Sequence, residues 1–234
     1  MKVLFFLFSL AVLCSCDWRV DLNGDTDGKS GTGGSGGAGS GGACATVITP
    51  DFFQSNNTTT SFDGTTFTHT ATANPAGEGA GVDTTNVASN TTGITYFEIT
   101  YTGSTGATGV QLATIFAESG FAAYSTIRLR PDMGDITDNM GNPIVSGLTI
   151  NPGYVLGFWL NHDTGDTFYQ DSFGNTGLLE NVPGLIGVNV MTGMAGTPAD
   201  IIGATITGTH NVGNSAFSLT PPLGAKDWCG NALN

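Results

Sequence analysis

Short runs of alternating apolar and polar residues, separated by turn-forming residues, fill the chain from Cys44 onward. Residues 94–101, for example, alternate in this way and then stop at Gly103, which is typical of a strand with one buried face. No window of 12 or more residues keeps the apolar period of a helix. Many short strands joined by turns are typical of an antiparallel sandwich. We therefore predict an all-β, two-sheet domain over residues 44–234.

The expected strands share β-branched and aromatic residues and are bounded by Gly, Pro, Asn or Asp. A hairpin is expected across residues 62–70, because Asp63-Gly64 lies between two strand-like runs. The remaining expected strands are residues 94–101, 110–116, 125–130, 154–160, 167–169, 185–190 and 201–207.

The first 15 residues form a targeting segment. Lys2 precedes an apolar run of 11 residues, which as a helix spans roughly 16 Å and is too short to cross a bilayer. The run ends in Leu13-Cys14-Ser15-Cys16, which resembles the lipobox of bacterial lipoproteins. That resemblance implies that Cys16 is the lipidated first residue of the mature chain, held on a membrane by its acyl chains. An ordinary signal peptide is the alternative.

The residue after Cys16 bears on the destination of the chain. Asp17 at this position resembles an inner-membrane retention signal of enterobacteria-like sorting systems. We expect a lipid-anchored protein of the bacterial cell envelope, on the outer membrane or cell surface, with the inner membrane as the alternative. Residues 16–43 are low in complexity and rich in Gly and Ser, so they are expected to form a disordered, flexible tether.

The charge balance limits the partners of the chain. It carries 19 acidic and 6 basic residues, for a formal net charge of −13. Nucleic-acid-binding modules carry a basic surface, so nucleic acid is excluded as a main partner. An anionic membrane surface also repels this chain, which leaves the lipid anchor as its expected membrane contact.

Three segments in register carry a family resemblance. They are residues 93–100 (GITYFEIT), residues 153–169 (GYVLGFWLNHDTGDTFY) and residues 216–226 (AFSLTPPLGAK). Together they resemble SPRY domains. The order and spacing match over roughly residues 50–230. The resemblance implies a concanavalin-like jelly roll of two antiparallel sheets. It also implies a non-catalytic domain that binds its partner through loops along one edge.

Besides the lipidated Cys16, two cysteines remain after export, Cys44 and Cys229. In the fold that the resemblance implies, both chain ends leave from neighbouring strands. An exported chain with one such pair favours a disulfide, and two unpaired thiols are the alternative.

An acidic segment over residues 131–143 is the predicted recognition surface, because it follows a strand and reads as a long loop. Its oxygen-bearing side chains suit a hard cation such as Ca²⁺, while two upstream arginines suit neutralisation of the same carboxylates. A solvated loop, a ligand-binding loop and a calcium site remain open, and no other cofactor is expected. The candidate ligand-binding residues are Arg128, Arg130, Asp132, Asp135, Asp138 and Asn139.

These features predict a membrane-anchored surface protein that presents a non-catalytic module for a protein or a glycan. One alternative is a glycan hydrolase or lyase, for which Glu98 and Glu118 are the nominal carboxylates. Another alternative is a structural component of the envelope. Trp159 is expected in the core rather than as a platform for stacking a sugar.

Overall fold

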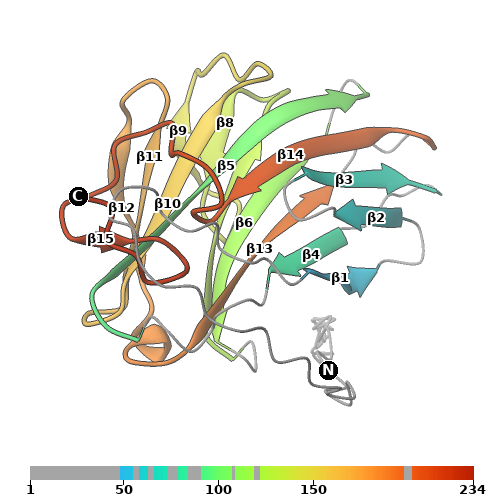
Figure 1. Ribbon diagram of the computed structural model, residues 1–234. Coiled ribbons are helices and arrows are strands. Elements are labelled where there is room, and N and C mark those ends of the chain that lie inside the picture. The colour runs from blue at the N-terminus through green and yellow to red at the C-terminus, as the bar shows by residue number, and fades with distance from the viewer. Residues whose placement is uncertain are drawn as a thin grey trace, which may run out of the picture. The chain divides into compact units, whose positions relative to one another are not determined.

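Two antiparallel sheets form a sandwich in the computed structural model of the chain (Figure 1). The structure describes residues 48–54, 58–62, 66–72, 79–83, 91–106, 109–118, 122–197 and 202–234. Within them, a seven-stranded sheet has the order β1-β4-β13-β6-β7-β8-β9. The second sheet has the order β12-β11-β10-β5-β14-β3-β2, with β15 paired to β5. The predicted all-β, two-sheet architecture is confirmed.

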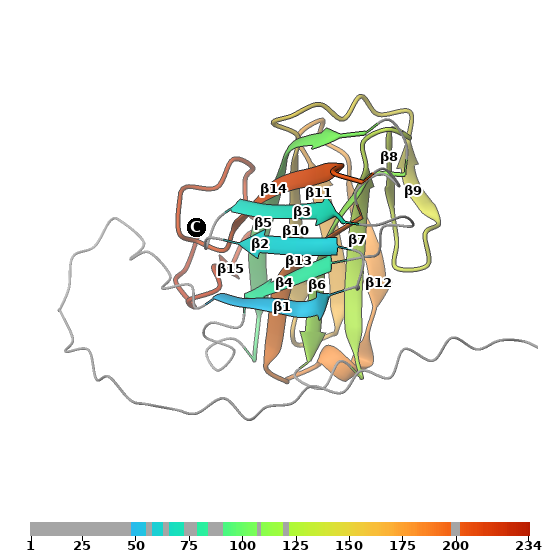
Figure 2. The same cartoon turned by 90° about the vertical axis from the view of Figure 1, so that its right-hand side faces the viewer.

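The strand bounds follow the chain in the two sheets. The seven-stranded sheet contains β1 (Ile48–Gln54), β4 (Gly79–Asp83), β6 (Gln111–Glu118), β7 (Tyr124–Arg130), β8 (Asp135–Thr137), β9 (Pro143–Ser146) and β13 (Val190–Thr197). The other contains β2 (Thr58–Phe62), β3 (Thr66–Ala71), β5 (Ile94–Thr105), β10 (Val155–Asn161), β11 (Asp166–Asp171), β12 (Thr176–Asn181), β14 (Thr205–Asn211) and β15 (Ala225–Lys226). β2 of one sheet lies beside β4 of the other (Figure 2).

Aromatic side chains from both sheets meet in the core. Phe97 of β5 lies 4.9 Å from Phe116 of β6, and Phe116 lies 4.7 Å from Phe158 of β10, measured between ring centroids. Trp228, just after β15, packs against the same cluster and is 2% exposed. Because edge-to-face and offset rings add to the free energy of apolar burial, this cluster fixes how the two sheets pack.

Most expected strands are present within a few residues of their predicted bounds. The hairpin at residues 62–70 is confirmed as β2 and β3, which pair Phe62 with Phe67, although its Asp63-Gly64 turn lies outside the described residues. The prediction of a strand over residues 185–190 is wrong. There the chain forms a short 3-10 helix, η1 (Pro183–Leu185), and turns at Gly187 with φ of 64° before β13 begins. Only the final residue of that apolar run enters the sheet, since a proline and a left-handed glycine favour a turn.

The predicted leader and tether lie outside the described residues, as do Cys16, Asp17 and Cys44. The lipidation site and the Cys44–Cys229 pairing therefore stay predictions. Cys229 itself is partly buried against the core. In the described part of the chain, no helix has the length and apolarity needed to cross a membrane.

All three histidines are buried, with exposures of 1% or less. His210 lies edge-on to Phe97, with ring centroids 5.0 Å apart. Burial lowers the pKa of His210 to about 3, and burial lowers that of His162 to about 4. The unfolded chain, with a histidine pKa of about 6.5, binds protons that the folded chain does not. Stability is therefore expected to fall as the pH drops from about 6.5 toward 4.

Replacing His210 by Leu should flatten this acid dependence. In the variant, the unfolded state takes up one proton fewer than it does in the native chain when the pH falls. The free energy of unfolding should therefore fall less steeply between pH 6.5 and 4. Denaturant unfolding at a series of pH values measures that slope. Thr192→Val is the matched control, because it removes the hydroxyl 3.4 Å from His210 Nε2 and leaves the imidazole. Equal slopes in His210→Leu and the native chain would contradict the assignment.

Candidate functional site

The acidic segment 131–143 is not the long loop that the sequence predicts. Residues 131–134 form a tight turn, β8 follows, a second turn covers residues 138–142, and β9 begins at Pro143. β8 pairs with β7 on one side and β9 on the other. The reason is Ile136, which is fully buried in the core and draws the segment into the sheet.

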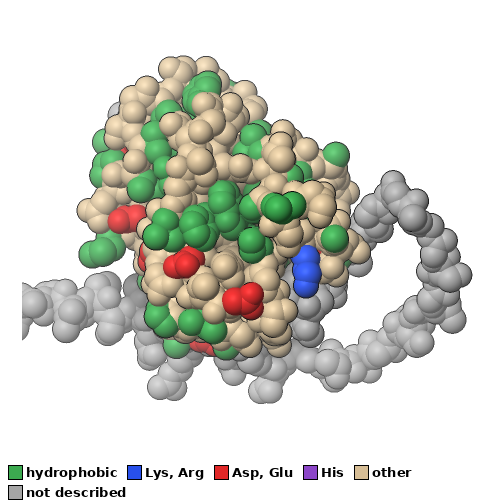
Figure 3. Space-filling model, turned by 90° about the vertical axis from the view of Figure 1, so that its left-hand side faces the viewer, with side chains coloured by type: hydrophobic (Ala, Val, Ile, Leu, Met, Phe, Trp, Pro, Cys, Tyr) green, Lys and Arg blue, Asp and Glu red, His purple; other side chains and the backbone are tan. Residues whose placement is uncertain are grey.

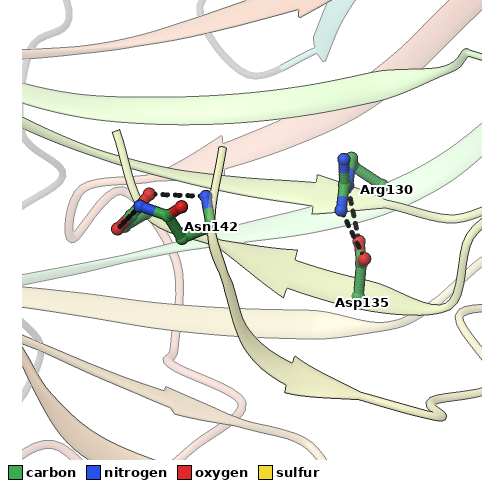
Figure 4. Close-up of polar contacts among 4 residues, drawn as sticks. Arg130, Asp135 and Asn142 are labelled. Carbon is green, nitrogen blue, oxygen red and sulfur yellow. Dashed lines mark hydrogen bonds and ion pairs between the residues drawn. The ribbon is translucent and has the colours of Figure 1, made fainter. Parts of the chain in front are cut away.

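Two of the predicted ligand residues bind each other across β7 and β8. Arg130 Nε donates to Asp135 Oδ1 at 2.7 Å, and its Nη2 donates to Oδ2 at 2.5 Å (Figure 4). These hydrogen bonds to Asp135 raise the pKa of Arg130. Because Asp135 is 5% exposed, little of its carboxylate is accessible to a ligand. The two parallel hydrogen bonds also fix the register of β7 and β8.

The other predicted residues have separate partners. Arg128 Nη1 donates to Gln111 Oε1 at 3.3 Å, and Asp132 Oδ2 accepts from the Gly109 amide at 2.6 Å. Asn139 lies in the turn after β8. In the described part of the chain, no group of three His, Cys, Asp or Glu side chains is arranged to hold a metal ion. The structure thus does not bring these residues together around a cation.

Asp138 closes the turn between β8 and β9. Its Oδ1 accepts the amides of Met140 and Asn142 at 2.9 and 2.8 Å. Its Oδ2 accepts from Asn142 Nδ2 at 2.9 Å, and Figure 4 shows Asn142 with its contacts. Partial burial acts to raise the pKa of Asp138. The hydrogen bonds from Asn142, Met140 and Gly141 outweigh it and hold the pKa below its usual value.

The same turn occurs three times with one sequence signature, Asp-x-x-Gly-Asn. It covers residues 138–142, 171–175 and 227–231, and in each the Asp accepts two backbone amides and the Asn side chain. The glycines have φ values of 81°, 89° and 83°, a region that favours glycine. This repeated signature was available in the sequence, and it identifies Asp138 as a turn residue.

A buried carboxylate organises the outer face of the eight-stranded sheet. Glu98 is 1% exposed, and it accepts the Tyr96 hydroxyl at 2.9 Å and the amides of Ser218 and Leu219 at 2.8 and 2.7 Å. Burial, and next the Glu98 charge, raise the pKa of Tyr96, so the phenol stays protonated and donates. Gln170 Nε2 then binds both the Tyr96 hydroxyl and the Thr220 carbonyl, at 3.0 and 2.9 Å.

These contacts join the three segments that carry the SPRY resemblance. β5 lies beside β10 with Tyr96 opposite Trp159 and Glu98 opposite Gly157, and residues 217–220 cross above them. A Cβ at Gly157 would lie 2.4 Å from the Tyr96 hydroxyl, so this position requires glycine. The three motifs, which lie far apart in the sequence, therefore contribute to one hydrogen-bonded network around Glu98.

The carboxylate pair of the glycan-cleaving alternative does not come together. Glu98 lies in the eight-stranded sheet under residues 217–220, whereas Glu118 ends β6 in the other sheet and accepts the Ala122 amide at 2.7 Å. A retaining glycosidase needs two carboxylates about 5 Å apart across a groove. These two glutamates do not supply that arrangement.

Trp159 lies on the outer face of the sheet and not in the core, contrary to expectation. Since Phe158 and Leu160 point inward, the strand alternation turns Trp159 outward, where it is partly exposed. Its ring lies 5.5 Å from that of Phe168 at an interplanar angle of 9°. Phe168 in turn pairs with Leu178 of β12, which is 55% exposed. We call Trp159, Phe168 and Leu178 the apolar row.

Other large apolar side chains are exposed in the turns that follow β11, β12 and β14. Phe173, Ile186 and Leu223 are 61%, 44% and 86% exposed. With Leu178 they make up four of the eight exposed large hydrophobic side chains in the described part of the chain. Figure 3 views the side where β11, β12 and the C-terminal end lie in Figure 1, and it shows hydrophobic side chains gathered in a band with acidic side chains beside it. Such gatherings mark interaction surfaces.

Comparisons with known proteins agree on architecture alone. No family model and no curated protein matches the chain. Similar solved structures include the SPRY domain of human HERC1, at 10% identity and TM-score 0.45 over 66% of this chain and 94% of that chain. The alginate lyase AlgAT5, from polysaccharide lyase family 7, matches at 11% identity and TM-score 0.43, over 68% of this chain and 81% of that chain. Arcelin-5, a lectin-like defense protein from Phaseolus vulgaris, matches at 10% identity and TM-score 0.43, over 70% of this chain and 89% of that chain. These β-sandwich structures include both binding and catalytic proteins, so the likeness does not choose between the two roles.

Replacing Glu98 by Gln should destabilise the domain by about 3 kcal/mol, because in either orientation its amide nitrogen would face one of the two backbone N–H donors, those of Ser218 and Leu219, in a buried site. Denaturant unfolding at pH 7 measures the loss. The matched control is Glu118→Gln, whose carboxylate accepts a single exposed backbone amide and whose replacement should cost less than about 1 kcal/mol. Equal stability of the two variants would show that Glu98 does not hold the C-terminal segment.

Proposed function

We propose that this chain is a lipid-anchored protein of the bacterial cell envelope whose SPRY-like sandwich is a non-catalytic binding module for a protein or a glycan. The observation that carries the proposal is the exposed apolar surface along β10–β12 and the turns beside it, at one edge of the sandwich. Exposed aromatic and aliphatic side chains contribute contact area and not acid–base chemistry, which suits recognition.

The surface is also rigidly supported. Trp159 and Phe168 stand on neighbouring central strands, and residues 217–220 are held against the same sheet by Glu98 and Gln170. A preformed surface loses little conformational entropy when a ligand binds, so it serves recognition without rearrangement. β12 ends the sheet order, which places the surface at an edge, as the resemblance to SPRY domains implies.

The anchor follows from the sequence features of the first 43 residues. A lipobox-like Leu13-Cys14-Ser15-Cys16 and a Gly- and Ser-rich tether suit a domain that is presented away from a membrane. The acidic chain is repelled by anionic headgroups, so the acyl chains supply the membrane contact. The outer membrane or cell surface is the proposed destination.

The anchor predicts that labelled palmitate is incorporated into the chain in a bacterial host and that Cys16→Ser abolishes the label. Cys14→Ser is the matched control and should keep it, because Cys14 belongs to the removed leader. Gel fluorography after metabolic labelling gives the result. Label retained in Cys16→Ser would contradict lipidation at this residue.

The binding role predicts saturable binding by the full chain to a glycan on an array or to a purified envelope protein. The double variant Phe173→Ser/Leu178→Ser should weaken it by about tenfold, since both side chains are exposed and lie at the proposed surface. Met140→Ser, which changes an 85% exposed side chain on the other sheet, is the control and should bind normally. Absence of saturable binding in both assays would refute the proposal.

A further inference from the structure

A second row of side chains runs beside the apolar row on the same outer face. Asn161 of β10 pairs with Asp166 of β11, and Asp166 pairs with Asn181 of β12. Asn161 and Asp166 are each two residues from a member of the apolar row on the same strand, so they share its face. Asn181 reaches that face as well, since its Nδ2 donates to Asp166 Oδ1 at 2.6 Å. We call Asn161, Asp166 and Asn181 the polar row.

The polar row is fixed in place. Asp166 Oδ2 accepts the Thr164 hydroxyl at 2.7 Å, and Asn181 Nδ2 also donates to the Thr164 carbonyl at 2.9 Å. The hydrogen bonds from Asn181 and Thr164 lower the pKa of Asp166, so its carboxylate stays ionised in mild acid. All three side chains are at least partly exposed, and they offer carboxylate and amide oxygens and amide N–H groups.

The two rows together have the chemistry of a sugar-binding surface. A pyranose ring has an apolar face of C–H groups and a rim of hydroxyls, each of which donates and accepts a hydrogen bond. A partly exposed Trp–Phe pair suits the apolar face, and a carboxylate between two amides suits neighbouring hydroxyls. The apolar row spans two strand spacings, about 10 Å, which matches the length of a few sugar units.

The net negative charge of the domain limits which glycans can bind to this surface. Residues 44–234 contain three basic side chains, Arg128, Arg130 and Lys226, against 15 acidic ones. Asp166 lies within the polar row, and Figure 3 shows acidic side chains beside the hydrophobic band on the side of the molecule where β11 and β12 lie. Uronate or sulfated chains would meet repulsion from these carboxylates. The surface suits a glycan without acidic groups.

We infer that the apolar and polar rows of β10–β12 form a binding site for a neutral glycan, with Trp159 stacking on a sugar ring and Asp166 binding its hydroxyls. This inference rests on the proposed binding function and names the ligand class of the same surface. It places the recognition residues on the outer face of the eight-stranded sheet, whereas the sequence predicted them in the acidic segment 131–143.

The test uses the detergent-solubilised full chain, with cellohexaose, maltohexaose and mannohexaose as soluble probes, polygalacturonate as the acidic comparison and an array of neutral glycans. Saturable binding to a neutral glycan is expected, with a change in tryptophan fluorescence that Trp159→Phe removes. Trp159→Ala should weaken binding by about tenfold or more. Leu178→Ala should weaken it by a few-fold and, because Leu178 is 55% exposed, should keep the fold. Tyr124→Ala, which changes a 39% exposed aromatic of β7, is the control and should bind normally.

The outcomes separate this inference from the proposed function. Neutral-glycan binding that both Trp159→Ala and Leu178→Ala leave unchanged overturns the site and leaves the binding module standing. Binding of an envelope protein alone, or preference for polygalacturonate, overturns the neutral-glycan inference in the same way. No saturable binding to any glycan or envelope protein overturns both.

Discussion

The buried Glu98 carboxylate supplies the interactions on which the candidate binding face of this domain depends. It occupies a site with 1% exposure, and its hydrogen bonds connect β5 to a segment 120 residues later in the chain. A buried charge is tolerated only where donors surround it, and here a phenol and two backbone amides do so. The network then extends through Gln170 to β11. It covers the sheet at the level of Glu98, and the neighbouring apolar row stays partly exposed.

Aspartates have a second structural role in this protein. Three Asp-x-x-Gly-Asn turns use one carboxylate each to bind two backbone amides and an asparagine side chain. Such turns satisfy backbone donors that strand ends leave unpaired. Together with the Arg130–Asp135 pair, they engage four of the 15 acidic side chains of residues 44–234 within the fold. The acidic residues that remain at the surface, Asp166 among them, shape the charge that a ligand meets.

The same strand alternation builds both the core and the candidate site. On β10, Leu156, Phe158 and Leu160 enter the core, while Gly157 and Trp159 face outward. Gly157 makes room for the Tyr96 hydroxyl, and Trp159 is the first member of the apolar row, stacked on Phe168. One strand thereby contributes to the core, supports the C-terminal segment and presents the proposed recognition surface.

The sequence by itself determined the fold class and most of the strands, because period-two alternation and turn residues are local properties. The three segments that meet at Glu98 were identified through their resemblance to SPRY domains. It also contained the repeated Asp-x-x-Gly-Asn signature that explains Asp138. Tertiary structure decided the rest. Ile136 drew the acidic segment into the sheet, and the direction of alternation on β10 placed Trp159 outside the core. The apolar and polar rows come from three strands, and their alignment depends on a strand register that long-range packing sets and that no single stretch of sequence specifies.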